Sequence, residues 1–225
     1  MDEWRLILYY PLGILPTIFF SLRFLLQWVQ SEKVQQSVVF PLFWRLSLAG
    51  NLIALTHYFI QMQFPFVIIQ GINAVISWRN LDLMRPEGST LSTRATLSCL
   101  AIAIAGLTTA FTLQGILFGG NFEWTHTPAK LMAVTPAPLI WHVIGTIGAG
   151  LFASRFWVQW YQAERQQQSR LNRTFWWLSI TGNVLSLAYF GRIGDTVSII
   201  NNAFCVVPAL RNLMLIARRS QLQES

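Results

Sequence analysis

Charged residues are scarce in this sequence. Asp, Glu, Lys and Arg make up 11% of the 225 residues, hydrophobic residues make up 53%, and the mean hydropathy is +0.45. Charged residues are about a quarter of a typical soluble domain, so this chain cannot build an ordinary water-exposed surface. The composition excludes a soluble globular protein and predicts an integral membrane protein.

Residues that carry common enzyme chemistry are sparse as well. The chain has two cysteines and three histidines, and no group of His, Cys, Asp and Glu has the spacing of metal ligands. The sequence supports no Ser-His-acid set, and no glycine-rich phosphate loop follows a strand. We therefore expect no catalytic residue, no metal and no cofactor.

What the sequence does have is long apolar stretches. A hydrocarbon core of roughly 30 Å is crossed by about 20 residues of helix. The apolar stretches are continuous and do not alternate, which favours helices over the strands of a membrane barrel. Seven membrane-spanning helices are predicted, at about 6–30, 39–62, 65–84, 94–118, 138–162, 172–191 and 195–217.

The chain is also internally duplicated. Residues 13–83 and 145–215 align without a gap at a constant offset of 132, and 22 of 61 positions from Arg23 to Leu83 are identical. Such a repeat decides how the whole chain packs. Several identical pairs are polar residues within apolar stretches: Arg23/Arg155, Gln27/Gln159, Glu32/Glu164, Asn51/Asn183 and Arg79/Arg211.

The basic residues are distributed unevenly over the predicted connections. One side carries ten of them: Lys33, Arg79, Arg85, Arg94, Arg165, Arg170, Arg173, Arg211, Arg218 and Arg219. The other side carries only Arg5, Lys130 and Arg192. By the positive-inside rule, the N-terminus lies outside and the C-terminus in the cytoplasm. The net charge of +7 follows this topology, so we expect no nucleic-acid partner.

The fourth predicted helix has no counterpart in the repeat. By returning the chain across the membrane it lets both three-helix copies keep the same orientation, which gives a three plus one plus three architecture with parallel repeats. We therefore predict a first repeat at 1–90, a linker helix at 91–120, and an outer loop with the second repeat at 121–225.

The repeated motif closely resembles that of the lipid A biosynthesis N-terminal domain family. The matching residues include Arg23-Phe24, Gln27-Trp28, Phe43-Trp44 and Arg79-Asn80-Leu81. The second copy departs from the pattern at Ala163, Arg173 and Ala203, where the first copy has Ser31, Pro41 and Gly71.

The family resemblance carries its own expectations. The family looks like a distant relative of the SWEET and PQ-loop transporters, which implies a bundle of two three-helix units around a linker, in a bacterial inner membrane. Its name suggests lipid-A-disaccharide synthase activity. A sugar-nucleotide glycosyltransferase needs α/β nucleotide-binding domains, however, and none fits in this chain, so we expect a protein that is not an enzyme.

Two arginines are the leading candidates for a binding site. Arg23 and Arg155 lie about two turns inside their predicted helices, and no acidic residue lies at hydrocarbon depth. A planar guanidinium without an internal carboxylate suits an anion such as a phosphate, which it can hold through two hydrogen bonds. The alternative is that both side chains snorkel to the lipid headgroups.

Polar and aromatic side chains accompany the arginines in both copies. One turn later come Gln27 and Gln159, followed by Trp28 and Trp160, which would stack on a sugar or form an interhelical clamp. Amides that could bind sugar hydroxyls in a pseudo-symmetric cavity are Asn51, Asn73, Asn183, Asn201 and Asn202. The small residues Ser47 and Gly50, with Ser179 and Gly182, indicate close helix packing.

Two further sets of residues suggest motion. Pro16 and Gly148 occupy equivalent positions and are candidate hinges, or else static kinks that improve packing. Charges of opposite sign at the predicted cytoplasmic ends suggest one latch or gate in each triplet, pairing Glu32 with Arg79 and Glu164 with Arg211.

These expectations favour a carrier or flippase for an anionic sugar-bearing lipid, such as a polyprenyl-phosphate sugar or a lipid A precursor, in envelope glycolipid biosynthesis. The alternative is a non-transporting accessory subunit that docks a glycosyltransferase. Uptake of a free sugar is a third possibility, although it would not require the arginines. The expected partners are the lipid-linked sugar or a phospholipid, the surrounding membrane lipids and a membrane-associated glycosyltransferase.

The predicted topology can be tested with reporter fusions. Fusions after Arg85 and after Ser225 should both report a cytoplasmic location, because ten of the thirteen basic residues counted above lie on that side. A periplasmic signal from either fusion would contradict the model.

Overall fold

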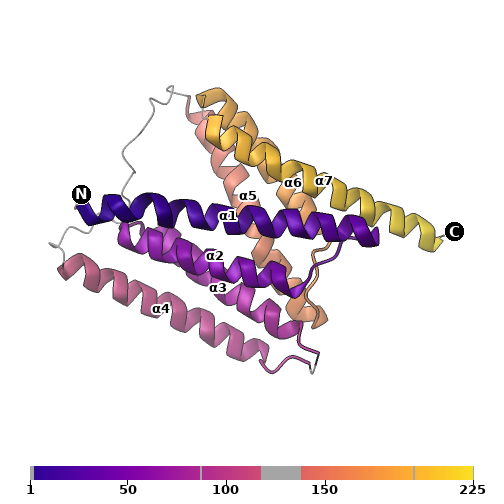
Figure 1. Cartoon of the computed structure of the whole chain (residues 1–225), viewed down its shortest axis with the longest axis horizontal. Helices are drawn as coiled ribbons and strands as arrows, with labels where there is room; N and C mark the ends of the chain where they lie inside the picture. Colours follow the sequence, from indigo (N-terminus) through magenta and orange to yellow (C-terminus); the bar gives the residue numbers. More distant parts are fainter. Residues whose placement is uncertain (1–2, 87, 118–137, 195, 225) are drawn as a thin grey trace. The chain divides into compact units, whose positions relative to one another are not determined.

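The computed structural model describes residues 3–86, 88–117, 138–194 and 196–224. Seven α-helices are formed by these residues (Figure 1): α1 Glu3–Val34, α2 Pro41–Ile60, α3 Phe64–Leu83, α4 Thr93–Leu117, α5 Leu139–Gln166, α6 Arg173–Ile193 and α7 Thr196–Glu224. The expected all-helical fold is confirmed for this part of the chain. The outer loop predicted at the start of the third segment, residues 121–137, lies outside the described residues.

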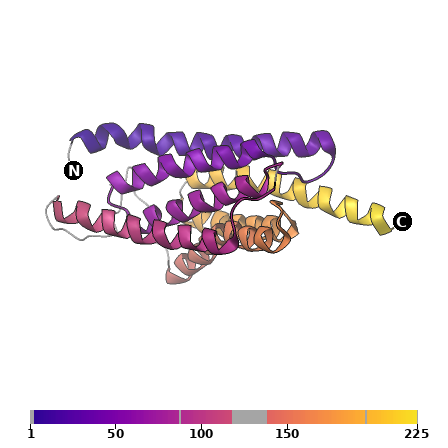
Figure 2. The ribbon, with the colours of Figure 1, turned by 90° about the horizontal axis from the view of Figure 1, so that it is seen from below.

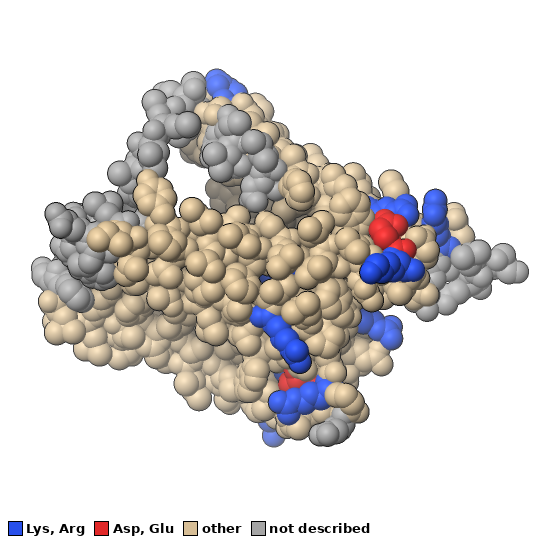
Figure 3. Space-filling view, in the orientation of Figure 1, with Lys and Arg blue, Asp and Glu red and all other residues tan. Residues whose placement is uncertain are grey.

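Three of these helices are long and apolar enough to cross a membrane. By length and composition the candidate spans are Tyr10–Val34, Thr93–Leu117 and Leu139–Gln166. Large apolar side chains are exposed on them, for example Ile102 at 71% and Leu139 at 79%. Figure 3 shows a face made mostly of uncharged side chains, with charged ones confined to small patches. The crossing of all seven helices stays a prediction.

Local sequence explains where several helices begin and end. Pro41 stands in the first turn of α2, where a missing N–H is harmless. The side chain of Asn172 caps α6 by accepting a hydrogen bond from the backbone N–H of Phe175 at 3.2 Å. The same helix ends at Gly194, whose φ of 76° favours glycine.

Three helices, α1, α5 and α7, run four or more residues beyond the ends predicted for their membrane spans. Helix α1 was predicted to end at residue 30 and ends at Val34. Helix α5 ends at Gln166 instead of residue 162, and α7 ends at Glu224 instead of residue 217. The added residues include Gln, Glu, Lys and Arg, which are good helix formers. An existing helix gains one hydrogen bond for each residue added, so it continues past the apolar stretch.

The chain folds into two compact units. Unit 1 contains Met1–Arg23 and Phe40–Pro128, and unit 2 contains Phe24–Val39 and Ala129–Ser225. In unit 1, α3 packs against both α2 and α4, and in unit 2, α6 packs against both α5 and α7 (Figure 1, Figure 2). The boundary falls within α1, so the second unit includes the end of the first repeat's leading helix. The predicted division at 1–90, 91–120 and 121–225 remains a prediction.

Glycines allow α5 and α6 to approach closely in unit 2. A Cβ added at Gly182 would lie 2.8 Å from the backbone N of Phe152 and 2.9 Å from the carbonyl O of Gly148. One added at Gly148 would lie 3.0 Å from the carbonyl O of Gly182 and from the backbone N of Ser186. This contact confirms that Gly182 serves helix packing.

The same contact bears on the two candidate hinges. Gly148 is in tight contact with the neighbouring backbone, so its replacement by alanine would disturb packing as well as backbone freedom. Pro16 is buried within α1, which continues unbroken through it. Hinge motion at Pro16 and Gly148 stays a prediction, and alanine at position 148 is a poor test of it.

We predict that Gly182→Ala destabilises the protein. Its methyl group would overlap the backbone of α5, and overpacking of this kind typically costs about 1–3 kcal/mol. Gly150→Ala is a matched control in the same unit, because nothing lies within 4 Å of its added Cβ. Thermal unfolding in detergent should show a lower midpoint for Gly182→Ala and an equal or higher midpoint for Gly150→Ala. Equal midpoints for the two variants would contradict the packing role.

Candidate functional site

Arg155 of α5 lies inside unit 2 among aromatic rings. The residue is 3% exposed, and its guanidinium carbon lies 3.2 Å from the ring centroid of Phe152 and 4.8 Å from that of Phe156. The rings of Phe24 and Phe175 follow at 5.6 and 5.7 Å. Attraction between the cation and the ring faces offsets part of the cost of removing the guanidinium from water. The side chain therefore lies in the protein interior and does not extend to the surface.

Arg23 of α1 is buried in unit 1 in a related way. It is 5% exposed, and its Nη1 donates a hydrogen bond to the Oγ of Ser47 at 2.7 Å. The hydroxyl of Ser47 in turn donates to the carbonyl of Phe43 at 2.7 Å. The rings of Phe20 and Phe43 lie 4.6 and 5.4 Å from the guanidinium carbon. Each copy of the repeat thus buries its arginine, and a single cavity shared by both arginines stays a prediction.

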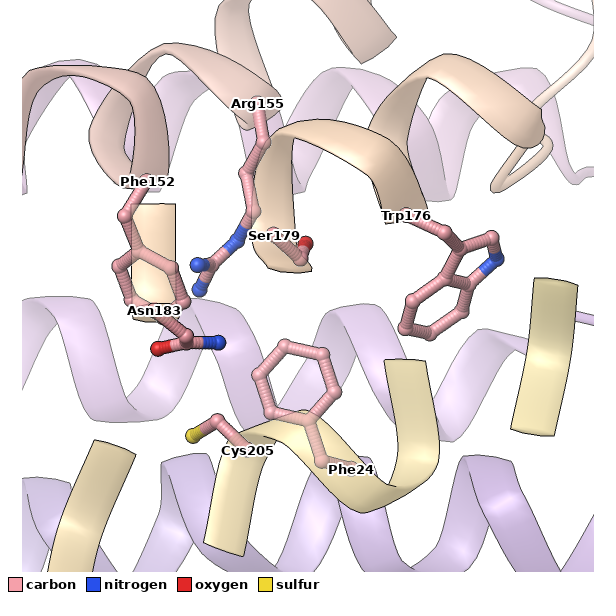
Figure 4. Close-up of a pocket in the computed structure, with 7 residues that line it drawn as sticks. All are labelled: Phe24, Phe152, Arg155, Trp176, Ser179, Asn183 and Cys205. Carbon is pink, nitrogen blue, oxygen red and sulfur yellow. The ribbon is translucent and has the colours of Figure 1, made fainter. Parts of the chain in front are cut away.

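A pocket lies beside Arg155 (Figure 4). It is lined by Phe24 of α1, Phe152 and Arg155 of α5, Trp176, Ser179 and Asn183 of α6, and Cys205 of α7. Its water-accessible volume is about 10 Å³, which is the room that one water molecule needs. None of the lining residues is acidic, so an anion that enters the pocket meets a cation and no opposing carboxylate.

The two equivalent asparagines differ in their hydrogen bonds. Asn51 of α2 is 3% exposed and donates through its Nδ2 to the Oγ of Ser77 at 3.2 Å. Asn183 of α6 is 1% exposed, and among the described residues neither its nitrogen nor its oxygen makes a hydrogen bond. In Figure 4 the amide of Asn183 and the guanidinium of Arg155 point toward the same space.

Gln27 forms a buried amide pair with Asn212 of α7 within unit 2. The Nε2 of Gln27 donates to the Oδ1 of Asn212 at 2.9 Å, and the Nδ2 of Asn212 donates to the Oε1 of Gln27 at 3.2 Å. Gln27 also donates to the Oγ of Ser31 and to the carbonyl of Val38. Its equivalent Gln159 donates to the carbonyl of Arg170 at 3.4 Å. These contacts fit the interhelical clamp that the sequence left open.

The predicted stacking tryptophans have polar partners on their own helices. The indole Nε1 of Trp28 donates to Glu32 at 3.1 Å, and that of Trp160 donates to Glu164 at 3.0 Å. Both pairs are four residues apart, a spacing that places side chains on one helix face. The repeat therefore preserves a Trp–Glu contact near the end of α1 and of α5, and stacking on a sugar stays a prediction.

The ion pairs differ from those predicted within each triplet. Arg211 of the second repeat forms a two-pronged pair with Glu32 of the first, with its Nη2 2.8 Å from Oε2 of Glu32. Arg79 pairs with Asp82, one turn along its own helix, at 2.8 Å. Glu32 and Arg79 thus each have another charged partner, Arg211 and Asp82. The expected pairs Glu32–Arg79 and Glu164–Arg211 stay predictions. Whether the charges at Glu32, Arg79, Glu164 and Arg211 act as latches stays a prediction.

Of the remaining predicted amides, the structure describes the side chains of Asn73 and Asn202. The Oδ1 of Asn73 is buried and makes no hydrogen bond within the described part of the chain, and Asn202 is half-buried. The side chain of Asn201 lies outside the described residues. No group of three His, Cys, Asp or Glu side chains in the described ranges could hold a metal ion.

Sequence reasoning missed several residues around these polar groups. Phe24, Phe152 and Cys205 line the pocket, and Asn212 forms the amide pair with Gln27. The repeat marked three of these four residues, because Phe24 is identical to Phe156 within the repeated motif. Phe152 repeats Phe20 at the offset of 132, and Asn212 repeats Asn80 in the Arg-Asn-Leu run.

The comparisons with known proteins agree with the duplication. The Lipid A Biosynthesis N-terminal domain matches twice, at residues 12–82 and 144–214. The chain belongs to this family. It is similar to proteins named lipid-A-disaccharide synthase from Chlamydia felis (38% identical over 216 residues), Chlamydia abortus (35% over 218) and Chlamydia caviae (36% over 214). No solved structure matches the chain.

The alignments cover little of these relatives. They include 95 to 96% of this chain but only 34% of each relative, so the chain spans about a third of their length. The relatives are named for an enzyme, which contradicts the prediction that the chain is not one. That prediction sought nucleotide-binding domains within this chain, whereas about two-thirds of each relative lies outside the alignment. The family is therefore linked to lipid-A-disaccharide synthase.

The Gln27–Asn212 pair gives a prediction about stability. Gln27→Leu and Asn212→Leu should each lower the free energy of unfolding by about 1–3 kcal/mol, because each leaves the amide oxygen of the other residue buried without its donor. The double variant should lose less free energy of unfolding than the two single variants lose together. The difference, which is the coupling energy between the two side chains, should be about 0.5–3 kcal/mol. Gln30→Leu, at an exposed position on the same helix, is the control and should stay within about 0.5 kcal/mol of the wild type. Additive losses measured by unfolding in detergent would exclude the clamp.

Proposed function

We propose that this chain binds the phosphorylated headgroup of an anionic, sugar-bearing lipid and serves as the lipid-handling membrane segment of lipid A disaccharide synthesis. The observation that carries this proposal is the burial of Arg155 beside a pocket. The arginine lies on α5, one of the helices long and apolar enough to cross a membrane. Membership of the lipid A biosynthesis family supports the same class of ligand.

An arginine within a membrane-spanning segment is costly and is normally paired or solvated. The rings around Arg155 offset part of that cost. A phosphate would supply the charge and would accept several N–H hydrogen bonds from the guanidinium. Conversely, a phosphorylated headgroup enters an apolar environment only if its charge is matched and its hydrogen bonds are replaced.

The finer proposal is a carrier or flippase. In this role the two repeats and the linker helix form a three plus one plus three bundle in a bacterial inner membrane, with the N-terminus outside and the C-terminus in the cytoplasm. The lipid tails stay in the bilayer while the headgroup crosses. The exposed apolar side chains and the uneven distribution of basic residues support this placement.

A second role, the docking of a glycosyltransferase, is favoured by one observation. The relatives contain an equivalent of this chain within a protein about three times as long that is named for a synthase. A segment that captures the lipid and presents it to a glycosyltransferase would explain that arrangement. Both roles require the same headgroup site and differ in whether the lipid crosses the membrane.

Lipid binding by purified protein tests the proposal. We expect the wild type to bind a synthetic diacyl sugar phosphate more tightly than the same lipid without its phosphate. Arg155→Gln should weaken binding of the phosphorylated lipid about 10- to 100-fold, because hydrogen bonds to charged groups contribute about 1.5–3 kcal/mol. Arg218→Gln, an exposed cation near the end of α7, is the control and should change binding by less than about twofold, because an exposed charge pairs weakly.

Native mass spectrometry of detergent-solubilised protein would measure both the preference and its loss. Equal affinity for the phosphorylated and dephosphorylated lipids would contradict the proposed function. A fluorescent analogue of the same lipid in liposomes then separates the two roles. Movement of the analogue between leaflets supports the carrier, and binding without movement supports the docking segment.

A further inference from the structure

The first repeat satisfies its buried asparagine with a neighbouring serine. Asn51 of α2 donates to the hydroxyl of Ser77 on α3 at 3.2 Å. That hydroxyl donates to the carbonyl of Asn73 at 2.7 Å. The side chains of Asn51 and Ser77 are therefore linked between α2 and α3, and Ser77 is 2% exposed. These contacts hold two helices together in the way expected of a structural hydrogen bond.

The second repeat lacks this serine. At the offset of 132, Ser77 corresponds to Ala209 of α7, which is 1% exposed and has no hydroxyl to offer. The equivalent of Asn51 is Asn183, whose amide makes no hydrogen bond to any described residue although it is 1% exposed. A buried amide without a partner destabilises a fold, so it needs an explanation beyond packing. Residues whose unpaired polar groups lower the stability of a fold are often part of a functional site.

The unpartnered amide faces the pocket that Arg155 also lines. Arg155 and Asn183 come from adjacent helices, α5 and α6, and point into the same space in Figure 4. The accessible space of about 10 Å³ fits one oxygen atom of the size of a water molecule. Arg155 supplies N–H donors and positive charge, and Asn183 supplies both a donor and an acceptor. The aromatic side chains of Phe24, Phe152 and Trp176 form much of the remaining wall.

We propose that Arg155 and Asn183 form a phosphoryl-binding site that exists only in the second repeat. The proposal rests on the proposed function and names the part of the chain that performs it. One phosphoryl oxygen occupies the accessible space of about 10 Å³ between the guanidinium and the amide. The oxygen of Asn183 accepts a hydrogen bond from a neighbouring sugar hydroxyl. The corresponding residues of the first repeat, Arg23 and Asn51, are structural.

The duplication offers a reciprocal test at equivalent positions. Ala209→Ser gives Asn183 the partner that Asn51 has, so binding of a synthetic diacyl sugar phosphate should fall at least fivefold while the melting temperature rises. Ser77→Ala removes the partner in the first repeat, so the melting temperature should fall while binding stays within twofold of the wild type. Both are single-atom changes, which keeps the two variants comparable.

Asn183→Leu is a second variant that does not depend on how an added hydroxyl packs. It replaces the unpartnered amide by an apolar side chain of similar size. We expect at least a tenfold loss of binding together with an unchanged or higher melting temperature, because no hydrogen bond to the described residues is lost. A purely structural asparagine would show the opposite pattern, with lower stability and unchanged binding.

The outcomes separate this inference from the proposed function. The preference of the wild type for the phosphorylated lipid over its dephosphorylated form tests the proposed function, and its absence overturns both. If that preference holds but Ala209→Ser and Asn183→Leu bind as the wild type does, only the second-repeat site is overturned. If Ser77→Ala weakens binding as much as Ala209→Ser, the two repeats contribute equally and the asymmetric site is also overturned.

Discussion

The structure depends on the pairing of polar side chains within apolar helices. An amide or guanidinium in such surroundings stabilises the fold only when it has a hydrogen-bond partner, since an unmade bond leaves the cost of desolvation uncompensated. Gln27 with Asn212, Arg23 with Ser47 and Asn51 with Ser77 meet this requirement. Because these bonds join different helices, they fix which helices are neighbours in a way that apolar contacts alone would not.

Close backbone contact is the second requirement, and it is strongest between α5 and α6. Gly148 and Gly182 leave no room for a Cβ, so the helices approach until backbone meets backbone. Arg155 lies two turns after Gly148 on α5, and Asn183 follows Gly182 directly on α6. The glycine contact thus brings the cation and the amide to one pocket. The same pair of glycines that serves packing also positions the candidate site.

Duplication followed by divergence explains how one family domain can contain both a scaffold and a site. The two matches to the lipid A biosynthesis domain preserve the arginine, the glutamine, the tryptophan and the asparagine. They differ at the position of Ser77 and Ala209: Asn51 donates a hydrogen bond to Ser77, whereas Asn183 makes no hydrogen bond to a described residue. In the proposed second-repeat site, the absence of this one hydroxyl leaves the amide of Asn183 available to a ligand. The relatives that share this segment are named lipid-A-disaccharide synthase.

The sequence by itself determined the seven helices and the repeat. Helix formation in an apolar segment depends on local composition and length, which the sequence states directly, and an ungapped offset of 132 identifies equivalent positions without any structure. It also identified Arg23, Arg155 and Asn183 as unusual polar residues. Only the tertiary structure decided their partners. Glu32 binds Arg211, and Asn183 makes no hydrogen bond to a described residue whereas Asn51 bonds to Ser77. Such pairings depend on which helix faces meet in space. The repeat pattern in the sequence is the same whichever helices are neighbours, so it does not reveal the pairings.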